Sequence, residues 1–449
     1  MKKFLSILLV IAFILTFAAG CGSKANTDPD VTKIKIYTKD FESWANGYIE
    51  DRIDEFNESQ DEIYVELKIY YDDQLYWQAI TTGRENGTSP DIYLISYNTL
   101  VREKEANNII SIDKYLTEEQ KSDISADVWK MVEIEDEHYA YPWYTEPSTL
   151  FYYRTDVLKK AGYDFAPKTF AELYDVCEKI APTLSRGRYC LSLPVGQADL
   201  SWTTVGLQKN MTGGFVVSDD WMESRIDEAG FKEIAQFFYT CIKNGWAAPA
   251  ALTTNGYGDN VISLADETAI MCWGGSWNIS LLYEQYPEAV EFIGISTIPT
   301  KDGDDTKCTA TNGGWTFGIS AQSSQAKQDA AWKFIEWMAA DDVARSAEYF
   351  KVEHMGKVPV RESVLNYMET AEYDIKPEWA ETVTKVASYA VPEVRFPFDL
   401  SYAVAAMFET CILNTNKDFE SVYAGALTTA KSTINTVMSR DSYGPNPYL

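Results

Sequence analysis

The sequence predicts a mixed α/β protein with two lobes. The chain has 449 residues, of which 46% are hydrophobic, so it can bury a large apolar core. Single cores stop growing beyond about 250–300 residues, and a chain of this length is therefore expected to divide into two lobes. In both halves of the chain, segments with the apolar period of a strand alternate with segments that have the period of a helix.

Three strands are predicted in the first half. Residues 33–37 and 63–69 alternate apolar and polar side chains, as half-buried strands do. Residues 92–95 form a continuous apolar run, which is typical of a strand that is buried on both faces.

Helices are predicted between these strands. Ile49, Ile53 and Phe56 recur at helical spacing, and a second helical stretch runs from about residue 73 to about residue 86. Strands and helices in this order build a parallel sheet with right-handed crossovers. In such sheets the loops that leave the carboxyl ends of the strands form the binding crevice. These loops are residues 38–44, 70–73 and 96–99.

The second half contains elements of the same kinds. Thr169 and Glu172 form a capping box, which predicts the start of a helix. A predicted strand over 269–273 is followed by a Gly-Gly-Ser turn and by a helix that begins near Trp277. Residues 402–438 are rich in Ala and are expected to be helical.

The N-terminus has the anatomy of an export signal. Two lysines precede an apolar run over 4–17, and small residues then lead to Cys21. The run is shorter than the roughly 20 residues that span a bilayer. A Cys directly after the small residues resembles a bacterial lipoprotein signal, so we expect residues 1–20 to be removed, Cys21 to be lipidated and residues 21–30 to form a tether.

Composition excludes several classes of partner. Lys and Arg total 39 against 67 for Asp and Glu, which gives a net charge of −28, and a surface this acidic repels nucleic acid and anionic lipid. With only 2 His and no CxxC pair, the chain has little room for a His-rich metal site or a His-based catalytic relay, so we expect no metal and no cofactor. Catalysis is disfavoured by composition rather than excluded, and we assign no catalytic residue. Because Cys177 and Cys272 lie within apolar runs, we expect the six cysteines after Cys21 to be mostly buried free thiols.

Aromatic residues give the strongest compositional signal. The chain has 13 Trp and 29 Tyr, and many of them stand beside turn residues rather than on periodic apolar faces. An indole or a phenol offers a flat apolar face and a polar edge. A pyranose offers C–H groups on one face and hydroxyls around its rim, so aromatics beside carboxylates and carboxamides suit a neutral sugar.

Two other functions stay open on the residues alone. A glycosidase needs only two facing carboxylates, which a sequence cannot place, although the chain has no HExxH, GxSxG or Ser/His/Asp pattern. A receptor for an anion or a peptide is the other alternative, since the Gly-Gly-Ser turn before Trp277 offers free amides and Arg395 offers a cation.

Several motifs in the chain resemble one family. They are residues 141–158 with 161–162 and 167–170, the Pro-Asp-Ile at 90–92, the strand and turn at 269–277, and the segments 313–315, 318–320 and 330–335. In this order they are similar to the bacterial extracellular solute-binding proteins of the carbohydrate-binding, maltose-binding-protein-like family. The resemblance covers nearly the whole chain.

The resemblance implies a set of ligand-binding residues. Glu146 matches a carboxylate that hydrogen-bonds sugar hydroxyls, Trp277 matches a stacking tryptophan, and Glu42 and Asn98 match polar positions in the cleft. The remaining positions that match the family are Gln197, Asp199 and Tyr402. Aromatic and polar placement near the same loops adds Trp44, Trp143, Trp202, Trp315 and Arg395.

The resemblance also implies a domain arrangement. The fold is expected to be periplasmic-binding-protein-like, of type II, with two α/β lobes and a ligand cleft between them. One lobe would comprise residues 31–143 and 309–365, and the other residues 148–305 and 372–449. Hinges are expected near Thr145, near residues 306–313 and in a third strand near 366–372.

The function that the resemblance implies is transport without catalysis. We expect a monomeric lipoprotein, anchored outside the cytoplasm of a bacterium, that captures a mono- or oligosaccharide when its lobes close. It would deliver this ligand to the permease of an ABC transporter. The membrane would be contacted only through the lipid anchor, and no nucleic acid would be bound.

Overall fold

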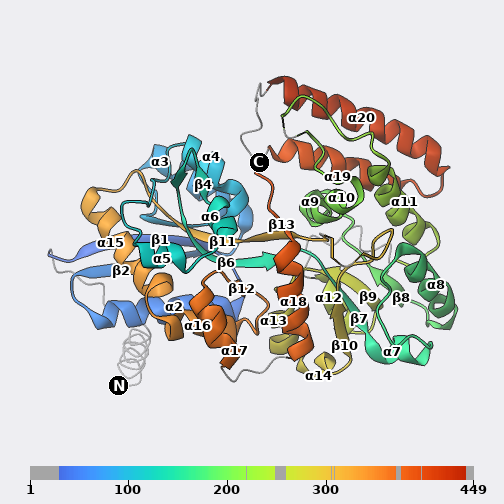
Figure 1. Ribbon diagram of the computed structural model, residues 1–449, viewed down its shortest axis with the longest axis horizontal. Helices are drawn as coiled ribbons and strands as arrows, with labels where there is room; N and C mark the ends of the chain where they lie inside the picture. Colours follow the sequence, from blue (N-terminus) through green and yellow to red (C-terminus); the bar gives the residue numbers. More distant parts are fainter. Residues whose placement is uncertain are drawn as a thin grey trace, which may run out of the picture.

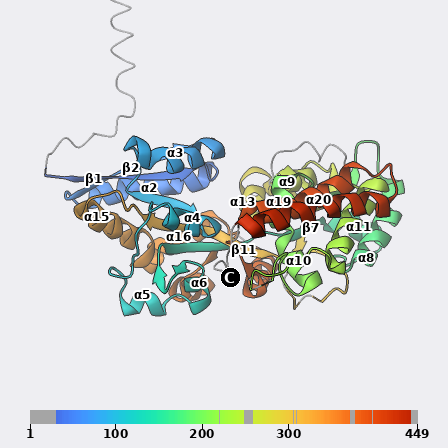
Figure 2. The same ribbon diagram turned by 90° about the horizontal axis from the view of Figure 1, so that it is seen from above.

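The computed structural model describes residues 30–218, 220–247, 259–304, 306–307, 309–370, 376–395 and 397–440. The chain forms two α/β lobes that lie side by side along the long axis of the molecule (Figures 1 and 2). The expected signal, the lipidation site Cys21, almost all of the tether and Cys308 lie outside the described residues.

The first lobe is built on a sheet of mixed direction. Its strands are β1 (Thr32–Lys39), β2 (Ile63–Tyr70), β3 (Ile92–Ser96), β6 (Tyr141–Pro147), β11 (Thr311–Ile319), β12 (Val358–Pro359) and β13 (Val391–Pro392). The order is β12-β6-β11-β3-β1-β2, with β13 paired to β11. β1 runs parallel to both β2 and β3, which confirms the parallel arrangement predicted for the first three strands. A small hairpin, β4 (Glu133–Ile134) and β5 (Glu137–His138), lies apart from the sheet.

Helices cover this sheet and bury its apolar residues in one core. They are α2 (Ser43–Ser59), α3 (Asp73–Asn86), α4 (Leu100–Glu105), α5 (Glu118–Ser122), α6 (Ala126–Lys130), α15 (Gln325–Ile335), α16 (Val343–Val352) and α17 (Glu362–Thr370). The periodic residues Ile49, Ile53 and Phe56 of α2 are all buried, as their spacing predicted. A single turn of π-helix, Glu336–Ala340, continues α15.

The second lobe has a smaller sheet of order β10-β7-β9-β8. Its strands are β7 (Leu150–Arg154), β8 (Tyr189–Ser192), β9 (Ala269–Gly274) and β10 (Ile293–Ser296). Its helices are α7 (Thr155–Lys160), α8 (Phe170–Ile180), α9 (Gln197–Thr203), α10 (Val205–Thr212), α11 (Ala229–Lys243), α12 (Asp259–Ala265), α13 (Asn278–Gln285), α14 (Pro287–Val290), α18 (Pro377–Tyr389), α19 (Phe398–Leu413) and α20 (Phe419–Arg440). The capping box of Thr169 and Glu172 is present at the start of α8.

Strands pass directly from one lobe to the other, and they are bonded to each other where they cross. β6 of the first sheet leads through Ser148 and Thr149 into β7 of the second. The Ser148 N–H donates to the carbonyl of Thr311 at 2.8 Å, and the Thr311 N–H donates to Ser148 Oγ at 3.0 Å. Both residues are buried. The two crossing strands therefore form one hydrogen-bonded junction between the lobes.

Two expectations about the second half are corrected by the structure. Residues 366–370 belong to helix α17 rather than to a strand, and residues 371–372 lie outside the described residues. β13, which was expected in the second lobe, pairs with β11 in the first sheet. The C-terminal region is helical as expected, in two helices, α19 and α20, with the polar segment 414–418 between them.

The described cysteines after Cys21 are buried free thiols, as the sequence predicted. Cys177, Cys190, Cys241, Cys272 and Cys411 are buried and form no disulfide with one another. None of the described helices is both long enough and apolar enough to span a bilayer.

Candidate functional site

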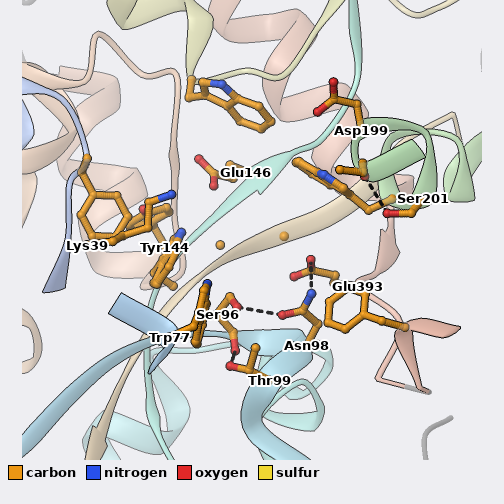
Figure 3. A pocket seen from close by; sticks show the side chains of 18 of the residues that line it. Lys39, Trp77, Ser96, Asn98, Thr99, Tyr144, Glu146, Asp199, Ser201 and Glu393 are labelled. Carbon is orange, nitrogen blue, oxygen red and sulfur yellow. Dashed lines mark hydrogen bonds between the residues drawn. The ribbon is translucent and has the colours of Figure 1, made fainter. Parts of the chain in front are cut away.

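A pocket of about 760 Å³ lies between the two lobes. This volume falls within the range of about 300–1,000 Å³ that is typical of small-molecule sites. Lys39, Trp77 and Ser96 face it from the first lobe, and Asp199 and Ser201 face it from the second (Figure 3). Glu146, on the crossover strand β6, lies between these two walls (Figure 3). A ligand in this pocket would touch both lobes and the strands that join them.

The first lobe contributes an aromatic wall. Trp315 of β11 stacks on Trp77 of α3, with ring centroids 6.3 Å apart and an interplanar angle of 21°. Phe41 meets Trp315 edge to face at 4.7 Å. Because Trp315 pairs with both Ser96 and Tyr144 on its neighbouring strands, these three residues reach the pocket at one level of the sheet.

The second lobe contributes a matching pair of indoles. Trp202 of α9 stacks on Trp277 with ring centroids 5.6 Å apart and an interplanar angle of 23°. The Trp277 ring lies against the backbone of Gly275, where an added Cβ would stand only 2.0 Å from the ring carbons. The turn itself is held by two hydrogen bonds, from Tyr152 Oη to the carbonyl of Gly275 and from the Ser276 N–H to the carbonyl of Pro147.

The loop after β1 carries a strained residue into the pocket. Glu42 has φ 91° and ψ 156°, a conformation that a residue with a Cβ rarely adopts. Asn46 holds the loop in place, since its carboxamide oxygen accepts from the Phe41 N–H at 3.1 Å and its amide donates to Asp40. Backbone strain of this kind persists where the surrounding structure enforces it, and it is common at binding sites.

A buried ion pair borders the pocket, since Lys357 is one of the lining residues. Lys357 is 2% exposed and stands 2.9 Å from the carboxylate of Glu353, which is fully buried. Burial alone would lower the pKa of Lys357, but the carboxylates of Glu353, Glu42 and Glu146 outweigh it and raise the pKa. Lys357 is therefore a cation at neutral pH, paired within the protein.

Two carboxyl groups at the floor of the pocket have raised pKa values. Burial is the largest cause for Glu146, whose pKa rises to about 7 although Lys357 opposes the shift. Burial and the neighbouring Glu146 raise the pKa of Glu393 to about 8. Glu393 accepts a hydrogen bond from the Asn98 amide at 2.8 Å, whereas Glu146 Oε2 has no hydrogen-bond partner within the described part of the chain (Figure 3).

These groups suit recognition of a polar molecule that has flat apolar faces. Indoles from both lobes offer stacking surfaces, while carboxylates, amides and hydroxyls offer hydrogen bonds. The described residues contain no cluster of three or more His, Cys, Asp or Glu side chains that could hold a metal ion.

The sequence of residues 51–382 matches the protein family described as bacterial extracellular solute-binding protein. The chain belongs to this family. It is accordingly an extracytoplasmic protein whose family binds solutes rather than transforming them. The architecture agrees, since two α/β lobes enclose the pocket between them.

Individual relatives are distant and are matched over part of their length. The chain is 23% identical to a maltotriose-binding protein from Pyrococcus abyssi over 64% of this chain and 58% of that protein. It is 31% identical to a probable ABC transporter-binding protein from Deinococcus radiodurans over 42% of this chain and 45% of that protein. The matches thus span only about half the length of these relatives.

Solved structures establish the fold. A solute-binding protein from Thermotoga lettingae, bound with alpha-D-tagatose, aligns with a TM-score of 0.74. The alignment covers 91% of this chain and 100% of that chain at 21% identity. The fold is therefore the one expected from the sequence, with two α/β lobes around a central cleft.

Most of the residues that the sequence singled out line the pocket of this solute-binding protein. Those that do are Glu42, Asn98, Glu146, Asp199, Trp202, Trp277, Trp315 and Tyr402. Gln197 instead donates its amide to the backbone carbonyl of Tyr402 at 3.1 Å, joining α9 to α19. The Arg395 guanidinium donates a hydrogen bond to the backbone carbonyl of Glu133, in the first lobe, at 2.8 Å. Arg395 is not among the described residues that line the pocket.

Two predicted tryptophans lie elsewhere for reasons of local geometry. The register of β6 against β11 shifts at Trp143, since Trp315 pairs with Tyr144 and Thr316 with Pro142. Trp143 is buried there and stacks on Tyr349, with ring centroids 4.2 Å apart. Trp44, at the start of α2, lines a separate surface groove between α2 and α16.

Several pocket residues escaped the sequence analysis. The charged and aromatic residues among those not predicted are Lys39, Asp40, Phe41, Trp77, Arg102, Tyr144, Lys357, Glu393 and Phe398. Trp77 lies on an amphipathic helix, where an aromatic residue is as easily part of the core. Glu393 follows β13, a strand of only 2 residues that is too short to produce a periodic pattern. Lys39, Asp40 and Phe41 lie in the predicted crevice loop 38–44, so the sequence did offer a signal for these three residues.

Proposed function

We propose that this solute-binding protein captures a carbohydrate in the pocket between its lobes. The observation that carries the proposal is the placement of two stacked indole pairs, Trp77 with Trp315 and Trp202 with Trp277, in opposite walls of one polar pocket. A sugar ring has apolar faces that stack on indoles and hydroxyls that bond to carboxylates and amides. The names of two similar proteins, one that binds maltotriose and one bound with tagatose, support the same ligand class.

Closure of the lobes would accompany capture. A ligand that touches one wall in an open state gains contacts with the other wall when the lobes approach, and this differential contact shifts the population toward the closed state. The bonded crossing at Ser148 and Thr311 is the expected bending region, because β6 and β11 pass through it. Rotation about short crossing strands is a common form of domain closure.

The partner would be the permease of an ABC transporter. The similarity to a probable ABC transporter-binding protein supports this assignment. The protein would be a monomer, held at the outer face of the cell membrane by acyl chains on Cys21. The N-terminal sequence supports this anchor through its lysines, its apolar run and the small residues before Cys21.

Binding without turnover is the property to test. The mature chain, from residue 21 with Cys21 replaced by Ser, is titrated by calorimetry against mono- and oligosaccharides, with inorganic phosphate and a peptide mixture as controls. We expect one-to-one binding of at least one saccharide and recovery of that saccharide unchanged after incubation. A hydrolysed saccharide would favour a glycosidase instead, and binding of phosphate or peptide alone would overturn the carbohydrate assignment.

A further inference from the structure

The floor of the pocket holds two carboxylates beside a residue that has no side chain. Gly313 of β11 pairs with Glu146 of β6, and its neighbour Asn312 pairs with Pro392, the residue before Glu393. A Cβ on Gly313 would stand 3.6 Å from Glu393 Oε2. The register of three strands thus sets Glu146 and Glu393 on either side of Gly313, facing the same space.

Neither carboxylate forms an ion pair within the described part of the chain, because the nearby cations are engaged elsewhere. Lys357 is paired with Glu353 at 2.9 Å. Arg102 is paired with Glu103 at 2.7 Å and stacks on Trp77. Lys39 lies over the ring of Trp315, with its Nζ 5.6 Å from the ring centroid.

The two carboxylates repel each other across the floor of the pocket, where both side chains are partly buried. Glu146 is the second cause, after burial, of the raised pKa of Glu393. Glu393 receives one hydrogen bond, from Asn98, while Glu146 Oε2 has no hydrogen-bond partner in the described structure. A buried acceptor without a partner is costly. A ligand with a positive charge and several hydrogen-bond donors would offset the repulsion between the two carboxylates. It would also supply the hydrogen bond that Glu146 Oε2 lacks within the described structure.

We propose that the ligand is an amino sugar whose protonated amine lies between Glu146 and Glu393. This inference rests on the proposed carbohydrate function and narrows its ligand class. An ammonium group carries three N–H donors and one positive charge, so it can donate to both carboxylates at once, whereas a hydroxyl donates only one hydrogen. The aromatic walls would hold the sugar ring above it.

The charge of the whole protein favours the same ligand. Among the described residues, the pocket lining has five acids, Asp40, Glu42, Glu146, Asp199 and Glu393, against three bases, Lys39, Arg102 and Lys357. The net charge of −28 adds a long-range field that attracts cations. A cationic sugar would therefore be steered toward the pocket and then held at its floor.

Matched pairs of sugars test the proposal on the same mature chain, with Cys21 replaced by Ser and the pocket unchanged. Calorimetry at pH 7 compares glucosamine with glucose, galactosamine with galactose, mannosamine with mannose, and the β-1,4-linked glucosamine dimer with cellobiose. In at least one pair we expect the amine to bind at least about tenfold more tightly than its neutral partner, since hydrogen bonds to charged groups are the stronger class. If every neutral sugar that binds does so as tightly as its amine, the inference is wrong and the proposed function stands. If no saccharide binds at all, the proposed function itself fails.

Variants identify the residues responsible. Glu146→Gln and Glu393→Gln each keep the shape of the side chain and leave no carboxyl that can ionise to pair with the amine, and each is expected to reduce the preference for the amine to about twofold or less. Glu62→Gln is the matched control, because it removes one exposed carboxylate far from the pocket and leaves the pocket lining unchanged. An unchanged preference in both pocket variants would overturn the assignment of the amine to this pair.

Discussion

Trp202 and Trp277 stack at 5.6 Å in the wall of the pocket that the second lobe provides. One indole comes from α9, and the other from the turn before α13, segments that are 75 residues apart (277 − 202). Their stacking forms a continuous apolar surface opposite the wall of Trp77 and Trp315. Predictions about binding follow from how each indole is held.

Loss of the Trp277 ring should weaken binding. Trp277→Ala removes one stacking surface and is expected to cost on the order of 1–3 kcal/mol of binding free energy, as for a buried aromatic anchor. Calorimetry with the ligand that the saccharide screen identifies measures this cost. Trp44→Phe is the control, because Trp44 lines a different groove, and it should leave the affinity unchanged. Equal affinity of Trp277→Ala and the unmodified protein would contradict the placement of the ligand.

The position of the Trp277 ring depends on Gly275. Gly275→Ala places a Cβ 2.0 Å from the ring carbons, so the ring must move away from its stacked position. We expect an affinity loss similar to that of Trp277→Ala, although no indole has been removed. Gly47→Ala is the matched control, since a Cβ there meets no atom within 4 Å, and Gly to Ala within a helix should stabilise the fold by about 0.5–1 kcal/mol. Retained affinity in Gly275→Ala would show that the ring position is not fixed by this glycine.

Stability should fall as pH rises from about 5 to about 8, in part because of Glu146 and Glu393. Their pKa values in the folded protein, about 7 and about 8, lie above the ordinary value of 4.5. Between pH 4.5 and these folded-state pKa values, the folded protein therefore binds more protons than the unfolded chain. The stability that this difference provides is lost as the pH rises through the folded-state pKa values. Glu393→Gln should raise the melting temperature at pH 8 relative to the unmodified protein, and change it little at pH 5. Thermal melts across this range measure the difference, and a parallel shift at both pH values would argue against the raised pKa.

The five described cysteines should be unreactive in the folded protein. Burial raises the pKa of the Cys411 thiol to about 12 and that of the Cys241 thiol further, so little thiolate is available. A thiol reagent should modify these five residues only after denaturation, and mass spectrometry of the digested chain identifies which sites react. A reductant should also leave the melting temperature unchanged. Modification of Cys241 in the native state would contradict this burial.

Regular periodicity and strong local signals made most of the fold predictable. The first three strands and the two helices between them were visible because each presents several apolar residues at a constant period. The capping box of Thr169 and Glu172 marked the start of α8 for the same reason, since its hydrogen bonds are local. The break between α19 and α20 was missed, although the polar segment 414–418 contains two Asn and an Asp.

The pocket was less predictable than the fold. Trp143 lies where the register of β6 against β11 shifts, and an irregularity of this kind leaves no periodic signal in the sequence. Lys357 and Glu393 could not be found from local patterns, because each lies beside a strand of 2 residues whose partner is far away in the sequence. Their placement depends on long-range pairing, of β12 with β6 and of β13 with β11.

The division of the pocket into walls and floor has an evolutionary consequence. Glu146, Gly313 and Glu393 stand on or beside strands that tie the lobes together, so a change in them alters both recognition and the bending region at once. The helices that carry wall residues each belong to one lobe only: α3 with Trp77 to the first, and α9 with Trp202 and α19 with Tyr402 to the second. These wall residues can change without altering the strands that join the lobes. Descendants of this scaffold would therefore acquire new sugars most readily by exchanging wall residues while they conserve the floor.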